Sequence, residues 1–160
     1  MATKKPLVVN AGQVQQIQAG DVLDAALTSE VDIFELENEN AAALAIGTPV
    51  YASSAGKVDE AQADAVGTVE VIGLVQAEIA IAGSGNIQTD GVLTATTGEW
   101  DIITGDTGGL TAGDIYYLDP DTAGMLTTTA PTNVGDFVVR VGKGLNTTAM
   151  EITILNAVKL

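Results

Sequence analysis

The placement of glycines between short β-prone runs is the feature that most constrains the fold of this 160-residue chain. Eighteen glycines separate short runs rich in valine, isoleucine and leucine, such as residues 31–36 and 137–141. Short β-prone runs bounded by glycine are typical of strands joined by tight turns, because glycine adopts turn conformations that other residues resist. Only 4% of the residues are aromatic, so the core has few large side chains to bury. The sequence therefore predicts a mostly β fold built from many short strands.

The glycine pattern occurs twice, at an offset of about 66 to 69 residues. In each copy a glycine precedes a tyrosine, and further glycines follow at matching places. The matched pairs are Gly47 and Gly113, Tyr51 and Tyr117, Gly56 and Gly124, and Gly67 and Gly135. We interpret residues 47–81 and 113–145 as two copies of one unit: a strand, a glycine turn, a short strand, a polar loop and a long strand. Chance similarity between glycine-rich β segments is the alternative interpretation.

Two copies and their linking strands predict a closed or nearly closed β-barrel, because closure removes exposed strand edges. We expect a single barrel-like domain over residues 13–160, preceded by an extended N-terminal arm over residues 1–12. Pro49 predicts an edge position for the first strand of its copy, since proline cannot donate to a strand ladder. The mostly apolar run 69–81 predicts one long central strand.

One segment, residues 96–105, carries the signals of a short helix. The expected signals are Thr97 as the N-terminal cap, Glu99 and Asp101 in the first turn, and Gly105 at the end. Trp100, the one tryptophan of the chain, lies in this segment. We expect Trp100 to be a core residue that closes one end of the barrel.

The predicted arm combines basic and apolar residues. Lys4 and Lys5 form a dense basic pair, and Leu7, Val8 and Val9 form a β-prone run just after it. An arm this short cannot bury that run by itself. It therefore either adds a strand to its own sheet or lies on a neighbouring molecule. These five residues are the candidate binding residues of the chain.

The formal net charge of −15 restricts the expected partners. Such a surface repels nucleic acid and anionic lipid, so neither is an expected partner. A solvated, soluble surface is the simplest interpretation; the alternative is a basic N-terminal tip that docks on an acidic partner. No run approaches the roughly 20 apolar residues of a membrane span, and the first residues lack the apolar core of a signal peptide. We therefore expect synthesis in the cytoplasm.

The chain contains no cysteine and no histidine. It thus lacks thiol nucleophiles, the usual zinc ligands and the side chain best suited to proton transfer near neutral pH. The glycine turns at 83–85 and 108–109 lack the lysine of a phosphate loop, and residues 119–122 lack the glycine and glutamate of a calcium loop. The carboxylates of Glu99 and Asp101 could form a pair for glycoside hydrolysis, but a sugar site usually carries several aromatic residues and this chain has few. We predict a non-enzymatic protein with no catalytic residues, no metal and no cofactor.

Several segments resemble a module encoded in tailed-bacteriophage genomes. They are LVVN at 7–10, QQIQAGD at 15–21, GNIQTDGVL at 85–93, GLTAG at 109–113 and YYL at 116–118. The stretches 96–100 and 124–131 resemble the same module. The resemblance covers most of the chain and links it to two kinds of phage protein: capsid decoration (cement) proteins and domains of tail-fibre or tail-tip proteins.

The resemblance implies a structural role in the virion. This chain shows no shaft repeats, no coiled-coil heptads and no second receptor-binding domain, which favours the decoration protein. Decoration proteins of this kind resemble β-barrel homotrimers that sit on the outer capsid surface, with N-terminal arms reaching over neighbouring subunits. The implied partners are further copies of the chain and the major capsid protein. The alternative is a tail-fibre or tail-tip component that contacts the host surface.

Overall fold

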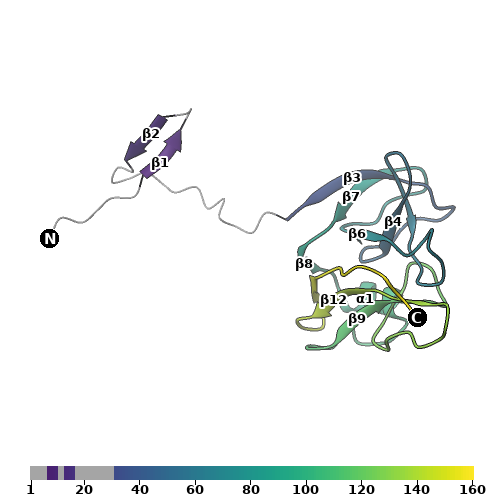
Figure 1. The fold of residues 1–160 in the computed structure, drawn as a ribbon. Coiled ribbons are helices and arrows are strands. Elements are labelled where there is room, and N and C mark those ends of the chain that lie inside the picture. Colours follow the sequence, from purple (N-terminus) through teal and green to yellow (C-terminus); the bar gives the residue numbers. More distant parts are fainter. Residues whose placement is uncertain (1–6, 11–12, 17–30) are drawn as a thin grey trace. The chain divides into compact units, whose positions relative to one another are not determined.

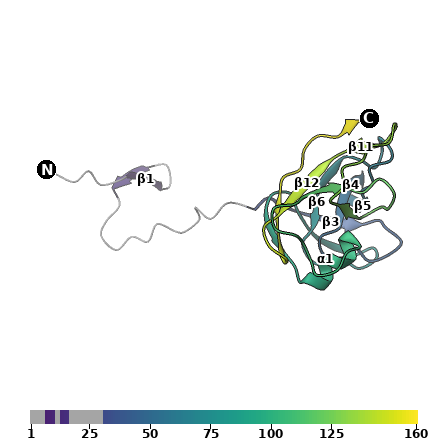
Figure 2. The same cartoon turned by 90° about the horizontal axis from the view of Figure 1, so that it is seen from below.

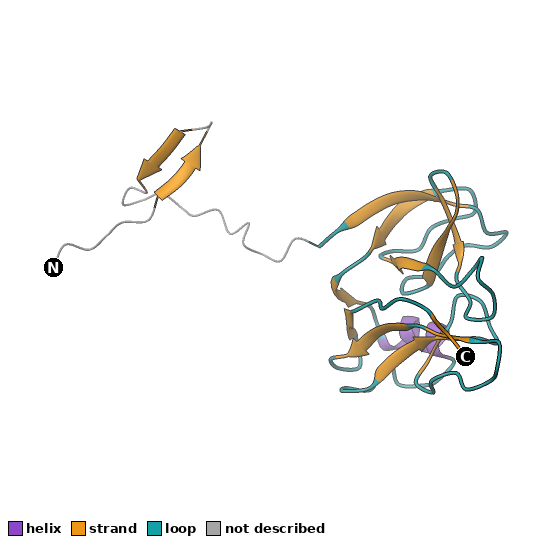
Figure 3. Ribbon diagram, viewed as in Figure 1, coloured by secondary structure: helices purple, strands orange, loops and turns teal. Residues whose placement is uncertain are grey.

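A computed structural model of the chain describes residues 7–10, 13–16 and 31–160. The chain divides into two units, Met1–Glu30 and Val31–Leu160. Within the described residues the elements are β1 Leu7–Asn10, β2 Gln13–Gln16, β3 Ile33–Asn38, β4 Pro49–Ser54, β5 Lys57–Glu60, β6 Val71–Val75, β7 Ser84–Gln88, β8 Gly91–Thr94, α1 Thr97–Thr104, β9 Ile115–Leu118, β10 Leu126–Thr127, β11 Phe137–Val138, β12 Arg140–Gly144, β13 Ala149–Ile152 and β14 Val158–Lys159. The predicted mostly β fold with one short helix is confirmed (Figures 1 and 3).

Residues 31–160, called the body below, contain a closed barrel and an open sheet of five strands each. The barrel has the order β3-β5-β4-β6-β7, and β7 is in turn paired with β3, so that every strand has two neighbours. The open sheet has the order β10-β9-β12-β13-β8. The predicted closed barrel is confirmed, but it contains only the strands of the first copy, β4, β5 and β6, together with β3 and β7.

The two sheets follow one plan. The order β5-β4-β6-β7-β3 in the barrel matches β10-β9-β12-β13-β8 in the sheet, and all these neighbours are antiparallel. The register also matches, because Val50 lies opposite Gly73 as Tyr116 lies opposite Gly142, with a bulge beside each pair. The internal repeat predicted from glycine spacing is therefore present in the strand pairing, and it extends from β3 to β13.

Glycines inside two strands allow this shared geometry. A Cβ atom on Gly73 of β6 would lie 2.6 Å from the carbonyl oxygen of Gln88. A Cβ atom on Gly142 of β12 would lie 2.6 Å from the carbonyl oxygen of Glu151. Only glycine lets β6 approach β7, and β12 approach β13, this closely.

The two copies differ in how their outer strands are joined. In the barrel, β3 and β5 pair in parallel through Glu37 with Lys57 and Asn38 with Val58. Their counterparts β8 and β10 do not pair and are the edges of the open sheet. The helix α1, which the chain inserts between β8 and β9, lies against β10. Figure 2 shows α1 at the margin of the body.

Two hydrophobic clusters make up the core of the body. The smaller cluster comes from the barrel strands and their connections and consists of Leu44, Val50, Val58, Val75, Ile79 and Ile87. The larger cluster draws on both copies and includes Leu74 of β6, Met150 of β13 and Trp100 of α1. Because β6 supplies Val75 to one cluster and Leu74 to the other, it is buried on both faces.

Trp100 is fully buried in the larger cluster. Its Nε1 atom donates a 3.0 Å hydrogen bond to the carbonyl oxygen of Thr148. Its ring packs on Gly47, where a Cβ atom would lie 2.8 Å from the ring carbon Cζ3. The expectation that Trp100 closes one end of the barrel is wrong, because α1 belongs to the second copy and presents the indole to the core that both copies share.

Three local predictions also need correction. The cap of α1 is Thr96 instead of Thr97, and Thr96 forms a capping box with Glu99. Pro49 starts β4, which has neighbours on both sides, and proline is tolerated there because it is the first residue of the strand. The run 69–81 does not form one strand: β6 ends at Val75, and the chain then turns before Ile79 forms an isolated bridge.

Gly47→Ala and Gly113→Ala form a matched test of the contact with Trp100. The two glycines occupy equivalent places, with φ of 86° and 93°, so alanine is strained at both. An added methyl group meets the Trp100 ring at position 47 but has no heavy atom within 4 Å at position 113. We expect Gly47→Ala to lower the free energy of unfolding by about 1–3 kcal/mol more than Gly113→Ala. Urea denaturation followed by tryptophan fluorescence measures both losses, and equal losses would contradict the contact.

Candidate functional site

The residues predicted to bind a partner lie in and before the first strand. Leu7, Val8 and Val9 lie in β1, which pairs antiparallel with β2 in a sheet of two strands. Lys4 and Lys5 lie outside the described residues. The boundary expected after residue 12 lies between these two paired strands, whereas the chain divides into its two units after residue 30. An isolated sheet of two short strands is marginally stable in water.

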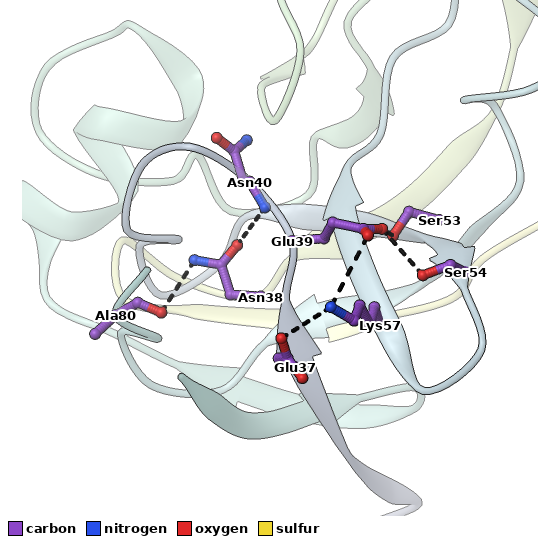
Figure 4. Close-up of polar contacts among 8 residues, drawn as sticks. All are labelled: Glu37, Asn38, Glu39, Asn40, Ser53, Ser54, Lys57 and Ala80. Atoms are coloured by element: carbon purple, nitrogen blue, oxygen red, sulfur yellow. Dashed lines mark hydrogen bonds and ion pairs between the residues drawn. The ribbon is translucent and has the colours of Figure 1, made fainter. Parts of the chain in front are cut away.

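A polar network spans the seam where β3 and β5 close the barrel (Figure 4). The Nζ atom of Lys57 lies 3.0 Å from Oε1 of Glu37 and 4.0 Å from Oε1 of Glu39. The hydroxyl groups of Ser53 and Ser54 donate hydrogen bonds of 2.6 and 3.1 Å to Oε2 of Glu39. The network therefore ties the end of β3 to the β4–β5 hairpin.

The electrostatics of this seam argue against nucleophilic catalysis. The hydrogen bonds from Ser53 and Ser54, together with the positive charge of Lys57, lower the pKa of Glu39. The hydrogen bond and the negative charge of Glu37 raise the pKa of Lys57. A carboxylate with a lowered pKa is a weaker base, so Glu39 is poorly suited to activate either serine. The network stabilises the seam, and because it is partly exposed its contribution is screened by salt.

Asn38 is the buried polar residue behind this seam, with 1% of its surface exposed. Its Nδ2 atom donates to three carbonyl oxygens, those of Ala42, Ile79 and Ala80, at 2.9, 3.2 and 3.2 Å. Its Oδ1 atom accepts a 2.8 Å hydrogen bond from the backbone N–H of Asn40. All its polar atoms have partners within the fold, so Asn38 anchors the β3–β4 connection and leaves no group for a ligand.

The other carboxylates considered from the sequence also serve local structure. Glu99 accepts a 2.7 Å hydrogen bond from the backbone N–H of Thr96, and Asp101 accepts one of 2.6 Å from that of Gly109. Asp119 Oδ1 accepts hydrogen bonds from the backbone N–H groups of Asp121 and Thr122, at 2.7 and 2.9 Å. Within residues 31–160 and the two N-terminal strands, no group of three metal-ligating side chains was found.

A shallow hollow lies beside the Asp119 turn. It is lined by Asp119, Pro120, Asp121, Thr127, Thr129, Ala130, Pro131, Thr132 and Asn133. Its volume of about 180 Å³ is below the roughly 300–1,000 Å³ of small-molecule sites. The hollow also lacks an aromatic side chain on which a sugar ring could stack. It does not form a site for a substrate or cofactor of ordinary size.

Sequence reasoning missed an exposed apolar stretch on β3. Residues 31–36 were expected to form a strand with two alternating faces, and β3 begins at Ile33 within this run. Phe34 is 56% exposed and Ile33 is 40% exposed. A signal is present in the sequence, because Ile33 and Phe34 stand between the acidic residues Asp32 and Glu35. Only the length of β5, however, shows that this part of β3 lacks a neighbour on one side.

No family model matches the chain. None of the curated proteins matches it either. Within the part of the chain that the structure describes, no helix is long and apolar enough to cross a membrane.

Glu39→Gln and Glu60→Gln test the electrostatics of the barrel through opposite effects. Glu39 has a lowered pKa, so its stabilising effect is present above its ordinary pKa of 4.5 and is lost as pH falls through the folded value. Burial raises the pKa of Glu60, so its ionised form opposes folding at neutral pH. We expect Glu39→Gln to lower, and Glu60→Gln to raise, the free energy of unfolding at pH 7. Both differences should shrink at pH 3 in urea denaturation, and shifts of the same sign at pH 7 would refute this electrostatic account.

Proposed function

We propose that this chain is a non-enzymatic structural protein of a bacteriophage virion that binds the outside of the capsid. It acts as a homotrimer that stabilises the shell, and its direct partner is the major capsid protein. It is made in the host cytoplasm and binds neither nucleic acid nor a membrane. The observation that carries the proposal is the phage-like sequence of the segments that build the body.

These segments occupy positions that determine the fold. Residues 85–93 run through β7, the turn and β8, and so join the two copies of the repeat. Residues 109–118 lead into β9, the strand of the second copy that pairs with both β10 and β12. The resemblance therefore includes residues of β7, β8 and β9 that take part in the strand pairing of both copies.

The polar groups of the body support a binding role without chemistry. Asn38, Glu39 and Asp101 are each engaged in hydrogen bonds that hold strands, turns or the helix. What the chain offers to a partner is backbone, apolar side chains and charge. A structural protein binds its partners through groups of these kinds.

Binding alone explains how such a protein stabilises a shell. Pressure from packaged DNA pulls capsid subunits apart, and a protein bound across their junctions adds free energy that must be lost before they separate. Three N-terminal segments in one trimer bind together at a local three-fold site, which raises the overall affinity. The net charge of −15 keeps neighbouring virions apart.

Deletion of residues 1–16 tests the N-terminal segment as the binding element. The deletion removes β1 and β2 together, so neither strand is left without its partner. The body should remain folded, with unchanged tryptophan fluorescence. Its affinity for purified capsids of the encoding phage should fall by about 2–3 kcal/mol, from lost apolar burial and charge contacts. Co-sedimentation with capsids measures this loss.

A pair of charge variants provides the control. Lys4→Ala with Lys5→Ala removes two positive charges from the segment, and Lys143→Ala with Lys159→Ala removes two from the body. The first pair should weaken capsid binding more at low salt than at high salt, and the second should leave it unchanged. If the truncated chain binds capsids as tightly as the full chain, the N-terminal segment is not the binding element.

A further inference from the structure

One edge of β3 is open along its first half. On one side β3 pairs with β7 from Ile33 to Glu37. On the other side β5 pairs only with Glu37 and Asn38, the last two residues of the strand. Within the described residues, nothing pairs with the backbone of residues 33–36 on that side.

The backbone hydrogen bonds show which groups face this edge. The N–H groups of Glu37 and Glu39 donate to carbonyl oxygens beside and within β5, at 3.0 and 2.9 Å. Backbone groups alternate sides along a strand, so the N–H and C=O groups of Ile33 and Glu35 face the same side. Because β5 does not extend that far, these two donors and two acceptors form a template for another strand.

The side chains along this edge define the partner. Phe34 and Leu36 share one face of β3, and Ile33 and Glu35 share the other. Phe34 is more than half exposed, and Glu35 is exposed as well. An added strand would place one side chain beside Phe34 on the first face and the next beside Glu35 on the second. An apolar residue complements Phe34, and a basic residue complements Glu35.

The surrounding charges strengthen the preference for a basic partner. Asp32 and Asp90 are exposed at the start of β3, where the Asp32 N–H donates a 2.9 Å hydrogen bond to Asp90. The cation on the adjoining seam, Lys57, is already paired with Glu37. A second copy of β3 contains no basic residue and so cannot place a cation beside Glu35, which makes it a poorer partner than a basic segment.

The counterpart strand β8 lacks the same features although it is also an edge strand. Leu93 of β8 corresponds to Phe34, since it lies opposite Met150 as Phe34 lies opposite Ile87. Leu93 is 3% exposed and belongs to the larger core cluster. β8 is therefore an internal control that has an open edge but no exposed aromatic residue.

We propose that the open edge of β3 binds an extended segment of a partner protein in which basic and apolar residues alternate. The segment adds a strand beside Ile33–Leu36, its backbone pairs with Ile33 and Glu35, and its apolar residues cover Phe34. This surface is made of residues of the body, and the proposal does not depend on where in a virion the chain is located.

The test uses the full chain and an eight-residue peptide of alternating lysine and valine. A peptide of alternating glutamate and valine is the control for charge. A basic peptide is attracted to any surface of this net charge, so the pattern of amide protection decides the outcome together with the affinity. Hydrogen exchange followed by NMR should show new protection of the Ile33 and Glu35 amides, and little change at Phe34 and Leu36, which already pair with β7.

Two variants separate backbone pairing from charge. Glu35→Pro removes the outward N–H without touching the ladder with β7, and it should weaken peptide binding about tenfold or more in fluorescence anisotropy. Thr94→Pro removes the matching outward N–H of β8 and should leave the affinity unchanged. Glu35→Lys keeps the N–H, reverses the charge and should also weaken binding at low salt, so the result does not depend on one variant folding.

Three results would overturn the proposal. The first is equal affinity for the lysine and glutamate peptides, or no binding of either. The second is binding without protection of Ile33 and Glu35, which would identify nonspecific attraction. The third is an edge already filled by another copy: the peptide would not bind, and the mass from light scattering would drop in Glu35→Pro.

Discussion

The larger hydrophobic cluster, in which the Trp100 ring packs on the backbone of Gly47, joins the two copies of the five-stranded unit. Gly47 leads into β4 of the barrel, and Trp100 comes from the helix of the second copy. The indole is fully buried and its nitrogen is paired with Thr148, so the ring is fixed in place. The contact requires glycine at position 47, since a side chain there would displace the ring.

The two copies differ in how their outer strands are joined. The first copy is a closed barrel because β3 and β5 pair in parallel. In the second copy, α1 fills the core beside β10, and β8 and β10 remain edges. The second copy, into which α1 is inserted, thus does not close into a barrel, and its helix contributes to a core that both copies share.

The sequence predicted what depends on local backbone geometry. Gly47 and Gly113 were matched because each precedes a tyrosine, and in the structure both lie in turns before a strand and have positive φ. The cap of α1 was misplaced by one residue although the spacing of Thr96 and Glu99 already indicated a capping box.

The central place of Pro49, the packing of Trp100 and the exposure of Phe34 depend on which distant strands pair and where β5 ends. Spacing in one sequence carries no information about these long-range contacts. Of the candidate binding residues, Leu7, Val8 and Val9 lie in β1, and their pairing with β2 was not predicted.

The most direct test of the proposed virion role is an electron-microscopy map of the phage that encodes this chain. The account predicts density that fits the body of residues 31–160 as clusters of three on the outer surface of the head, repeated at its local three-fold positions. Density for the body on the tail alone would contradict the account and support the tail-fibre or tail-tip alternative.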